Sequence, residues 1–167
     1  LGDERVTDYS SRGPSRYDFF AKPDIIATGH QVISLSAPGS KLFAGFPALH
    51  VYGGSEEEGQ PARYITLSGT SMAAPMAAGA AAQVLGTNPR LSANAVKMVL
   101  QFTARTLPGA DALTQGAGYL NALGATRLAA MINPKAPEGV YWLRRGSVPG
   151  TNEDLNGETV TWGKRII

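Results

Sequence analysis

The sequence predicts an α/β fold in which helices flank a parallel sheet. Two short apolar runs with β-branched residues, at 31–36 and 64–67, are each closed by a glycine-containing turn and are typical of strands. The second run leads directly into an alanine-rich segment at 70–86, and alanine is the residue that most favours a helix. Strands that alternate with helices suggest crossover connections and therefore parallel pairing. Part of those connections would precede Leu1.

The composition is that of a chain able to bury a core. Of the 167 residues, 43% are hydrophobic and 17% are charged, while 20 glycines and 11 prolines provide for many turns. The formal net charge is only +2 and no dense Lys or Arg run occurs, so a nucleic-acid interface is not supported. The absence of cysteine excludes a disulfide scaffold, a cysteine-ligated zinc site and a thiol nucleophile. No apolar run reaches the ~18 residues that a membrane span requires.

The beginning of the chain suggests a cut within a longer protein. It reads Leu1-Gly2-Asp3, without Met and without a positively charged stretch that leads into an apolar one, so no signal peptide is predicted. We interpret Leu1 as an internal cut, which processing, proteolysis or the design of the expressed piece could each produce.

The segments before the first helix are expected to be mostly turns and short strands. Residues 1–22 are polar and turn-rich, and Pro23 favours extended geometry before the apolar run 25–27. Residues 40–62 form an aromatic-rich insertion that contains the acidic tip Glu56-Glu57-Glu58. We expect this tip to be a solvated loop, with a cation site as the alternative.

Three helices are expected in the remaining sequence. The segment 70–86 is apolar almost all round, which predicts a buried helix whose small side chains let neighbouring backbones approach closely. The second helix covers 93–104, with Ser92 as its N-cap. The third covers 120–131.

Prolines after the third helix mark a predicted domain boundary. Residues 1–134 would form the main domain, and residues 135–167 an extension or linker outside the main core. The extension contains a strand-like run at 159–162. Its Trp142 and Trp162 are expected to pack within it rather than to contact a ligand.

Ser71 lies at the junction where a strand ends, a glycine turns the chain and a helix begins. The N–H groups at a helix start are unpaired, and the helix dipole favours negative charge there. An oxyanion that forms beside Ser71 would therefore be stabilised, while Gly69 keeps side-chain bulk away from a substrate. Two interpretations remain open on residue types alone, since a serine at this position also serves as an ordinary helix cap.

The junction resembles the nucleophile motif of the subtilisin-like serine proteases, the subtilases. The match is Ser68-Gly69-Thr70-Ser71-Met72-Ala73-Ala74-Pro75. The family pattern continues with His-Val-Ala-Gly where this chain has Met76-Ala77-Ala78-Gly79, and that family His is not the catalytic base. Three further segments resemble family segments in the same order, so that the resemblance covers about residues 6–131: Tyr9-Ser10-Ser11-Arg12-Gly13-Pro14, Lys22-Pro23-Asp24-Ile25-Ile26-Ala27-Thr28-Gly29 and Gly116-Ala117-Gly118-Tyr119-Leu120-Asn121-Ala122.

The resemblance implies a reaction and a role for each residue of the junction. The chain would be the C-terminal part of a subtilisin-like domain that hydrolyses peptide bonds through an acyl-enzyme on Ser71. The backbone at Ser71 and Thr70 would support the oxyanion hole, and Ser68 and Gly69 would form the turn that the substrate approaches. The chemistry would require no cofactor.

The resemblance also shows which parts are missing. The family triad runs Asp, His, Ser, with the Asp in an Asp-Ser/Thr-Gly motif and the His in a His-Gly-Thr motif, and neither motif occurs here. His30 and His50 are expected to be structural or surface residues. The partner would be the N-terminal portion of the same domain, which would supply the Asp, the His and an oxyanion-hole Asn. The chain alone should then be inactive, with a tendency to self-associate.

Other properties follow from the resemblance alone. Family members are mostly secreted or otherwise outside the cytoplasm, and many bind structural calcium, although no calcium site is visible in this sequence. Peptides or proteins would be the substrates. The alternatives are a non-catalytic structural or binding fragment derived from a subtilase, and a regulatory chain produced by processing.

Overall fold

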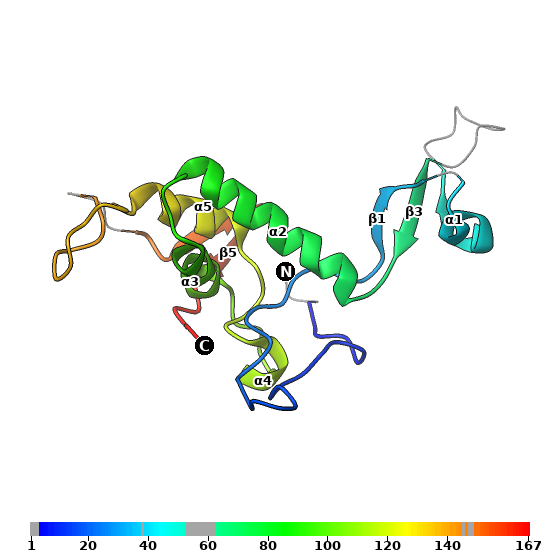
Figure 1. Ribbon diagram of the computed structural model, residues 1–167, viewed down its shortest axis with the longest axis horizontal. Helices are drawn as coiled ribbons and strands as arrows, with labels where there is room; N and C mark the ends of the chain where they lie inside the picture. The colour runs from blue at the N-terminus through cyan, green and yellow to red at the C-terminus, as the bar shows by residue number, and fades with distance from the viewer. Residues whose placement is uncertain (1–3, 38, 53–62, 145, 147–148) are drawn as a thin grey trace. The chain divides into compact units, whose positions relative to one another are not determined.

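The computed structural model describes residues 4–37, 39–52, 63–144, 146 and 149–167 (Figure 1). The acidic tip at 56–58 lies outside the described residues. The chain divides into two compact units, which we call the small unit (residues 28–74) and the large unit (residues 1–27 and 75–167). Helix α2 (Thr70–Thr87) begins in the small unit and continues into the large one.

A three-stranded antiparallel sheet forms the centre of the small unit. Its strands are β1 (Val32–Leu35), β3 (Tyr64–Leu67) and β2 (His50–Val51), in the order β1-β3-β2. A short helix, α1 (Lys41–Gly45), and a 3₁₀ turn, η1 (Pro47–Leu49), lie between β1 and β2 in the chain. Both predicted strands are therefore confirmed, whereas α1, η1 and β2 were not predicted.

The strand directions differ from the expected parallel sheet. Both pairs in the small unit are antiparallel, and the described residues between β1 and β3 form only the short elements α1, η1 and β2. Antiparallel strands do not need the long crossover connection that parallel strands require. Among the described residues, parallel pairing is confined to a bridge between Ile26 and Tyr119, where the Leu120 N–H donates to the Ile26 carbonyl at 2.8 Å. The mixed α/β content is as predicted, and the described sheets are small.

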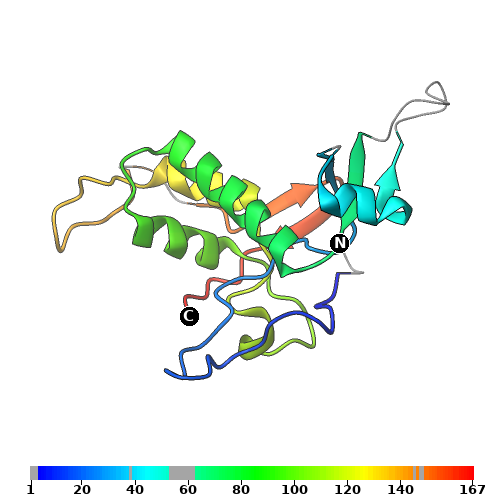
Figure 2. The same ribbon diagram turned by 45° about the vertical axis from the view of Figure 1, so that its right-hand side comes forward.

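Helices α3 (Ala93–Thr103) and α5 (Ala122–Met131) form the core of the large unit together with the C-terminal part of α2 (Figure 2). The predicted N-cap is confirmed, since Ser92 Oγ accepts a hydrogen bond from the Ala95 N–H at 3.2 Å. A four-residue helix, α4 (Ala112–Gln115), was not predicted. The buried side chains of this core come from the three long helices, from residues next to them in the chain and from the C-terminal segment: Ala80, Val84, Leu91, Val96, Val99, Leu100, Ala125, Leu128, Ala129, Ile132, Leu143 and Trp162.

The expectation that α2 is buried is wrong for this chain. Only Ala80 and Val84 are buried, whereas Met76 is 41% and Leu85 40% exposed. A side chain added at Gly79 would meet no atom within 4 Å. The helix is apolar almost all round, and only the stripe with Ala80 and Val84 is buried among the described residues. The remaining apolar surface of α2 is thus available to a partner.

The C-terminal segment packs onto the main core, contrary to expectation. Trp162 is 2% exposed and belongs to the core, while Trp142 is 47% exposed. The hairpin of β4 (Asn152–Leu155) and β5 (Glu158–Thr161) carries Glu153, whose carboxylate accepts a hydrogen bond from Asn121 Nδ2 at 2.6 Å. The segment is held because Trp162 is large and apolar and Glu153 is buried against a helix cap. The domain boundary near residue 134 stays a prediction.

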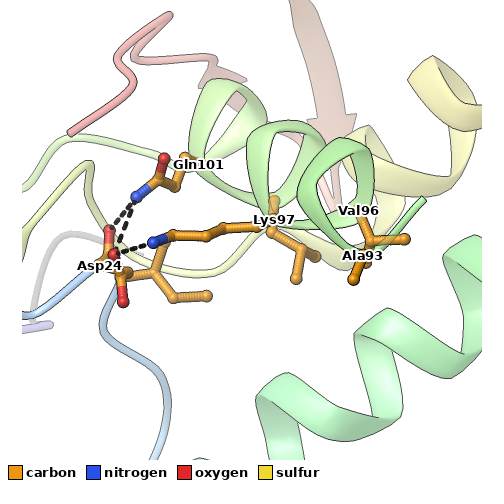
Figure 3. Close-up of a pocket in the computed structure, with 7 residues that line it drawn as sticks. Asp24, Ala93, Val96, Lys97 and Gln101 are labelled. Carbon is orange, nitrogen blue, oxygen red and sulfur yellow. Dashed lines mark hydrogen bonds and ion pairs between the residues drawn. The ribbon is translucent and has the colours of Figure 1, made fainter. Parts of the chain in front are cut away.

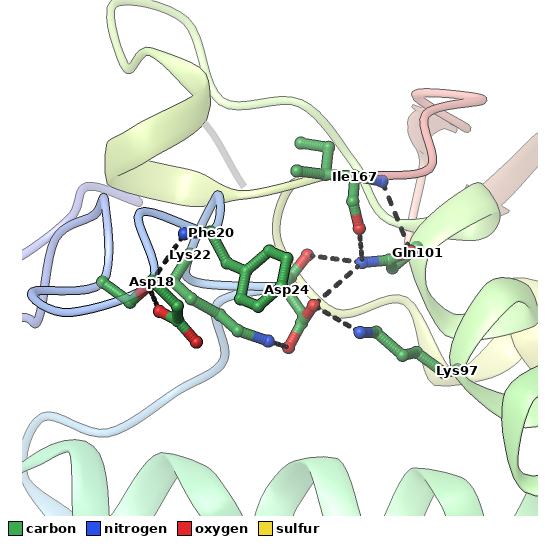
Figure 4. A network of polar contacts seen from close by, with 8 residues as sticks. Asp18, Phe20, Lys22, Asp24, Lys97, Gln101 and Ile167 are labelled. Atoms are coloured by element: carbon green, nitrogen blue, oxygen red, sulfur yellow. Dashed lines mark hydrogen bonds and ion pairs between the residues drawn. The ribbon is translucent and has the colours of Figure 1, made fainter.

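A polar cluster around Asp24 connects the N-terminal segment to α3 (Figure 4). The Asp24 carboxylate contacts Lys22 Nζ at 2.7 Å and Lys97 Nζ at 2.8 Å. Gln101 Nε2 lies 3.4 Å from the same carboxylate and donates to the Ile167 carbonyl at 3.1 Å. Apolar side chains of Ile25 and its neighbours on α3 line the adjoining pocket (Figure 3). The cluster therefore joins three distant parts of the chain at the edge of an apolar surface.

This cluster makes stability depend on pH. Partial burial acts to raise the pKa of Asp24, but hydrogen bonds from Lys22 and Lys97 and their positive charges outweigh it, so the pKa lies below its ordinary value of 3.8. The resulting stabilisation is present above the ordinary value and is lost as the pH falls through the lower folded-state pKa. We expect Asp24→Asn to reduce the free energy of unfolding by about 1 kcal/mol at neutral pH, since both pairs are partly exposed.

Urea denaturation of the variant and the parent at several pH values measures this difference, with Glu138→Gln, an exposed carboxylate outside the cluster, as control. The difference should vanish in strongly acidic buffer. An Asp24→Asn effect that grows as the pH falls would contradict the assignment.

The surroundings of two helical glycines predict that substitution by alanine has opposite effects on stability. A Cβ at Gly124 would lie 2.7 Å from both Asn121 Nδ2 and Trp162 Nε1, so Gly124→Ala should destabilise the chain by about 1–3 kcal/mol. Gly79→Ala meets open space and should stabilise α2 by up to ~1 kcal/mol through helix propensity. Thermal unfolding of the two variants tests the packing of α5 directly. If both variants shift the melting temperature in the same direction, the surroundings described for one of the two glycines are wrong.

Candidate active site

The turn between β3 and α2 is built around Gly69. Its φ of +152° is a conformation that favours glycine. Its N–H donates to the Gly29 carbonyl at 2.7 Å, and its own carbonyl accepts from the N–H groups of Met72 at 3.0 Å and Ala73 at 3.4 Å. Gly69 was predicted to leave space for substrate. Through these hydrogen bonds it also connects β3 to α2 and to the backbone at Gly29.

Gly29 is a supporting residue that the sequence analysis missed. A Cβ at this position would lie 2.7 Å from the Gly69 carbonyl oxygen and 3.1 Å from the Ala73 Cβ. The backbone at Gly29 can pass this close to the turn only because it carries no side chain. The available signal was the glycine that ends the segment 22–29, one of the family-like segments.

Ser68 has a structural hydrogen bond. Its Oγ accepts from the Gln31 N–H at 2.8 Å, which ties the end of β3 to the residue before β1. The Ser68 hydroxyl thus bonds to the backbone and holds the end of β3 beside the start of β1.

Ser71 is the second residue of α2, and its side chain is exposed. The first N–H groups of a helix, here those of Thr70 and Ser71, have no partner one turn earlier in the helix. Pro75 lacks the N–H that would pair with the Ser71 carbonyl. The turn therefore presents an accessible hydroxyl beside backbone donors at the positive end of a helix dipole, an arrangement that suits attack on a carbonyl and stabilisation of the resulting oxyanion.

The two histidines differ in their surroundings. His50 Nε2 lies 2.8 Å from the Phe43 carbonyl oxygen, and its ring stacks on Phe43 with centroids 3.8 Å apart. This imidazole is part of the packing of the small unit, as expected. His30 is exposed just before β1.

The described residues form neither a cluster of metal ligands nor a helix that could span a membrane. Within those ranges, no group of three His, Cys, Asp or Glu side chains lies close enough to hold a metal ion. No helix in the described ranges is both long and apolar enough to cross a bilayer.

Comparison with known proteins identifies the family. The model of the subtilase family matches residues 2–125. Serine protease AprX of Bacillus subtilis (strain 168) is 40% identical over 120 residues, which cover 72% of this chain and 25% of that protein. Subtilisin DY of Bacillus licheniformis is 33% identical over 114 residues, covering 68% of this chain and 39% of that protein.

A third relative also matches part of the C-terminal segment. Minor extracellular protease Vpr of Bacillus subtilis (strain 168) is 32% identical over 160 residues, covering 93% of this chain and 18% of that protein. The chain thus spans a quarter or less of the length of AprX and Vpr. These matches show that the chain belongs to the subtilase family of serine proteases.

Proposed function

We propose that this protein is a serine endopeptidase whose nucleophile is Ser71. The observation that carries the proposal is the exposed hydroxyl of Ser71 at a turn that Gly69 and Gly29 hold in place, beside the first N–H groups of α2, which have no partner within the helix. The family membership supports the reaction class, and the substrates are peptides or proteins.

The reaction forms and then breaks an ester on Ser71. Ser71 Oγ attacks the scissile carbonyl carbon while a base accepts its proton, and the carbonyl oxygen becomes an oxyanion. The Ser71 N–H, with the neighbouring backbone at Thr70, donates to that oxyanion. The base returns the proton to the leaving amine, and water then hydrolyses the ester. Gly69 leaves the approach to Ser71 free of side-chain bulk.

The base and its orienting carboxylate are proposed to come from outside this chain. Neither Asp-Ser/Thr-Gly nor His-Gly-Thr occurs in the sequence. We propose that an upstream portion of the same catalytic domain supplies the Asp, the His and the oxyanion-hole Asn. The uncovered apolar surface of α2 around Met76 and Gly79 supports such a partner, because apolar helix surface favours burial. The chain alone is then inactive and prone to self-associate through the same surface.

The location and cofactors follow from the family only. We propose that the complete enzyme is secreted or otherwise extracytoplasmic, in line with the name of its relative Vpr, an extracellular protease. The mechanism requires no cofactor, and structural calcium would belong to the complete domain.

A second candidate function is a non-catalytic one. It is a subtilase-derived fragment that binds or supports other proteins without cleaving them. The two candidates differ in whether Ser71 ever becomes reactive.

Reaction with a fluorophosphonate probe separates the candidates. In the presence of the upstream portion, the probe should label Ser71, because only an activated hydroxyl attacks phosphorus at neutral pH. Ser71→Ala should abolish labelling and reduce peptide hydrolysis by several orders of magnitude. Peptide mapping by mass spectrometry locates the label.

Ser68→Ala is the matched control, since it removes a hydroxyl three residues away that the structure assigns to Gln31. This variant should still be labelled at Ser71. Labelling that survives in Ser71→Ala but disappears in Ser68→Ala would show that the assignment is wrong.

The exposed surface of α2 generates a second prediction. Gly79→Val adds bulk where the chain alone has open space, so it should leave the melting temperature of the chain nearly unchanged. If the upstream portion packs there, the same variant should weaken association by roughly tenfold or more, because overpacking costs about 1–3 kcal/mol.

Titration of the upstream portion into the chain, followed by calorimetry, measures this association. Gly79→Ala, with one methyl group, is the graded control and should have a smaller effect. Equal affinity for all three proteins would remove the α2 surface from the proposed interface.

A further inference from the structure

The glycine at position 29 is required by space and not by backbone conformation. Its φ lies outside the left-handed region, so an alanine fits the same backbone conformation. A Cβ there would lie 2.7 Å from the Gly69 carbonyl oxygen, 3.1 Å from the Ala73 Cβ and 3.3 Å from the Ala73 nitrogen. Two of these three atoms belong to the backbone, which cannot rotate away as a long side chain does. The missing side chain of Gly29 therefore leaves room for the turn that carries Ser71.

The Gly69 carbonyl oxygen, the nearest of these atoms, is the first hydrogen-bond acceptor of α2. It accepts from the N–H groups of Met72 at 3.0 Å and Ala73 at 3.4 Å. Ser71 lies between this acceptor and both donors in the chain, so the rings that these hydrogen bonds close contain Ser71. A displacement of the Gly69 carbonyl thus turns the first residues of α2, and with them the N–H and Oγ of Ser71.

The segment 29–31 also holds the turn by two hydrogen bonds. The Gly69 N–H donates to the Gly29 carbonyl at 2.7 Å, and the Gln31 N–H donates to Ser68 Oγ at 2.8 Å. Gln31 has a φ of +52°, a conformation that is uncommon for a residue other than glycine. All these residues belong to the small unit. The turn before Ser71 is therefore fixed by a segment about 40 positions earlier in the chain, and Gly29 is its closest point of approach.

We propose that Gly29 is a positioning residue for peptide hydrolysis: through the Gly69 carbonyl it sets the orientation of the hydroxyl and the N–H of Ser71. This inference rests on the proposed function, because it assigns a supporting residue to the same reaction. Gly29 itself touches no reacting atom in this proposal. Its effect is large because attack and oxyanion stabilisation depend on exact geometry, and a misplacement of about 1 Å can reduce a rate ~100-fold.

The substitution Gly29→Ala should act on the chemical step and leave substrate binding nearly unchanged. The added methyl group displaces the Gly69 carbonyl and misaligns Ser71. We expect kcat on a short chromogenic peptide to fall roughly 10- to 100-fold. KM should change less than about twofold, since an interaction made only in the transition state lowers kcat without weakening ground-state binding.

The test uses the enzyme formed by this chain with its upstream portion. Titration with a fluorophosphonate counts the molecules whose Ser71 reacts, and kcat is then expressed per reactive site. A misfolded fraction lowers the number of sites but does not change this value, so the measurement separates positioning from folding. Gly45→Ala is the matched control, because Gly45 also lies in the small unit and a Cβ there would meet no atom within 4 Å. This control should keep the kcat and KM of the parent.

Several outcomes would overturn the proposal. These are a kcat per reactive site equal to that of the parent, the same loss in Gly45→Ala, or a loss of kcat/KM that comes from KM alone. If Gly29→Ala contains no reactive Ser71, thermal unfolding decides. A folded but unreactive chain supports the positioning role, whereas a chain that has lost the unfolding transition of the parent shows that Gly29 serves the fold alone.

Failure of this inference can be told apart from failure of the proposed function. If the parent enzyme neither reacts with a fluorophosphonate at Ser71 nor cleaves the peptide, the proposed function itself is wrong. If the parent does both and Gly29→Ala matches its rate per site, the proposed function stands and only the positioning role of Gly29 is refuted.

Discussion

The hydrogen bond from the Gly69 N–H to the Gly29 carbonyl is the contact on which the small unit and its candidate site depend. At 2.7 Å it brings two backbone segments together that only glycine allows so close, since a Cβ at Gly29 would lie 2.7 Å from the Gly69 carbonyl oxygen. This contact fixes the direction in which β3 enters α2. Ser71 is exposed on the turn that this contact holds, and the N–H groups beside it have no partner within α2 because they begin the helix.

Local signals explain which elements could be predicted. β1, β3, α2, α3 and α5 follow from residues adjacent in sequence: β-branched runs, alanine content and capping side chains such as that of Ser92. The two-residue β2 and the partner of β5 in the C-terminal hairpin depend on pairing between segments, which no local pattern encodes. The antiparallel direction of β1 and β3 depends on how the chain between them folds, and it too could not be derived locally.

The same distinction holds for the candidate site. The position of Ser71 at a strand-to-helix junction was predictable because the strand, the glycine and the helix are consecutive. The contribution of Gly29 was not, because its contact joins residues 40 positions apart in the chain. The prediction that α2 is buried was wrong. The apolar composition of the helix shows that its surface favours burial, but it does not show which part of that surface this chain covers. The exposed side chains of α2, among them Met76 and Leu85, are the observation behind the proposal that an upstream portion packs on this helix.

The most direct test of this account is a crystal structure of the chain with its upstream portion, inhibited by a peptide boronic acid. A boronic acid adds to an activated hydroxyl and mimics the tetrahedral intermediate. The account predicts a covalent bond from boron to Ser71 Oγ, a boronate oxygen that accepts a hydrogen bond from the Ser71 N–H, and an imidazole of the upstream portion within hydrogen-bond distance of Oγ. A boron bonded to another hydroxyl, or an Oγ with no base beside it, would contradict the assignment of Ser71 as the nucleophile.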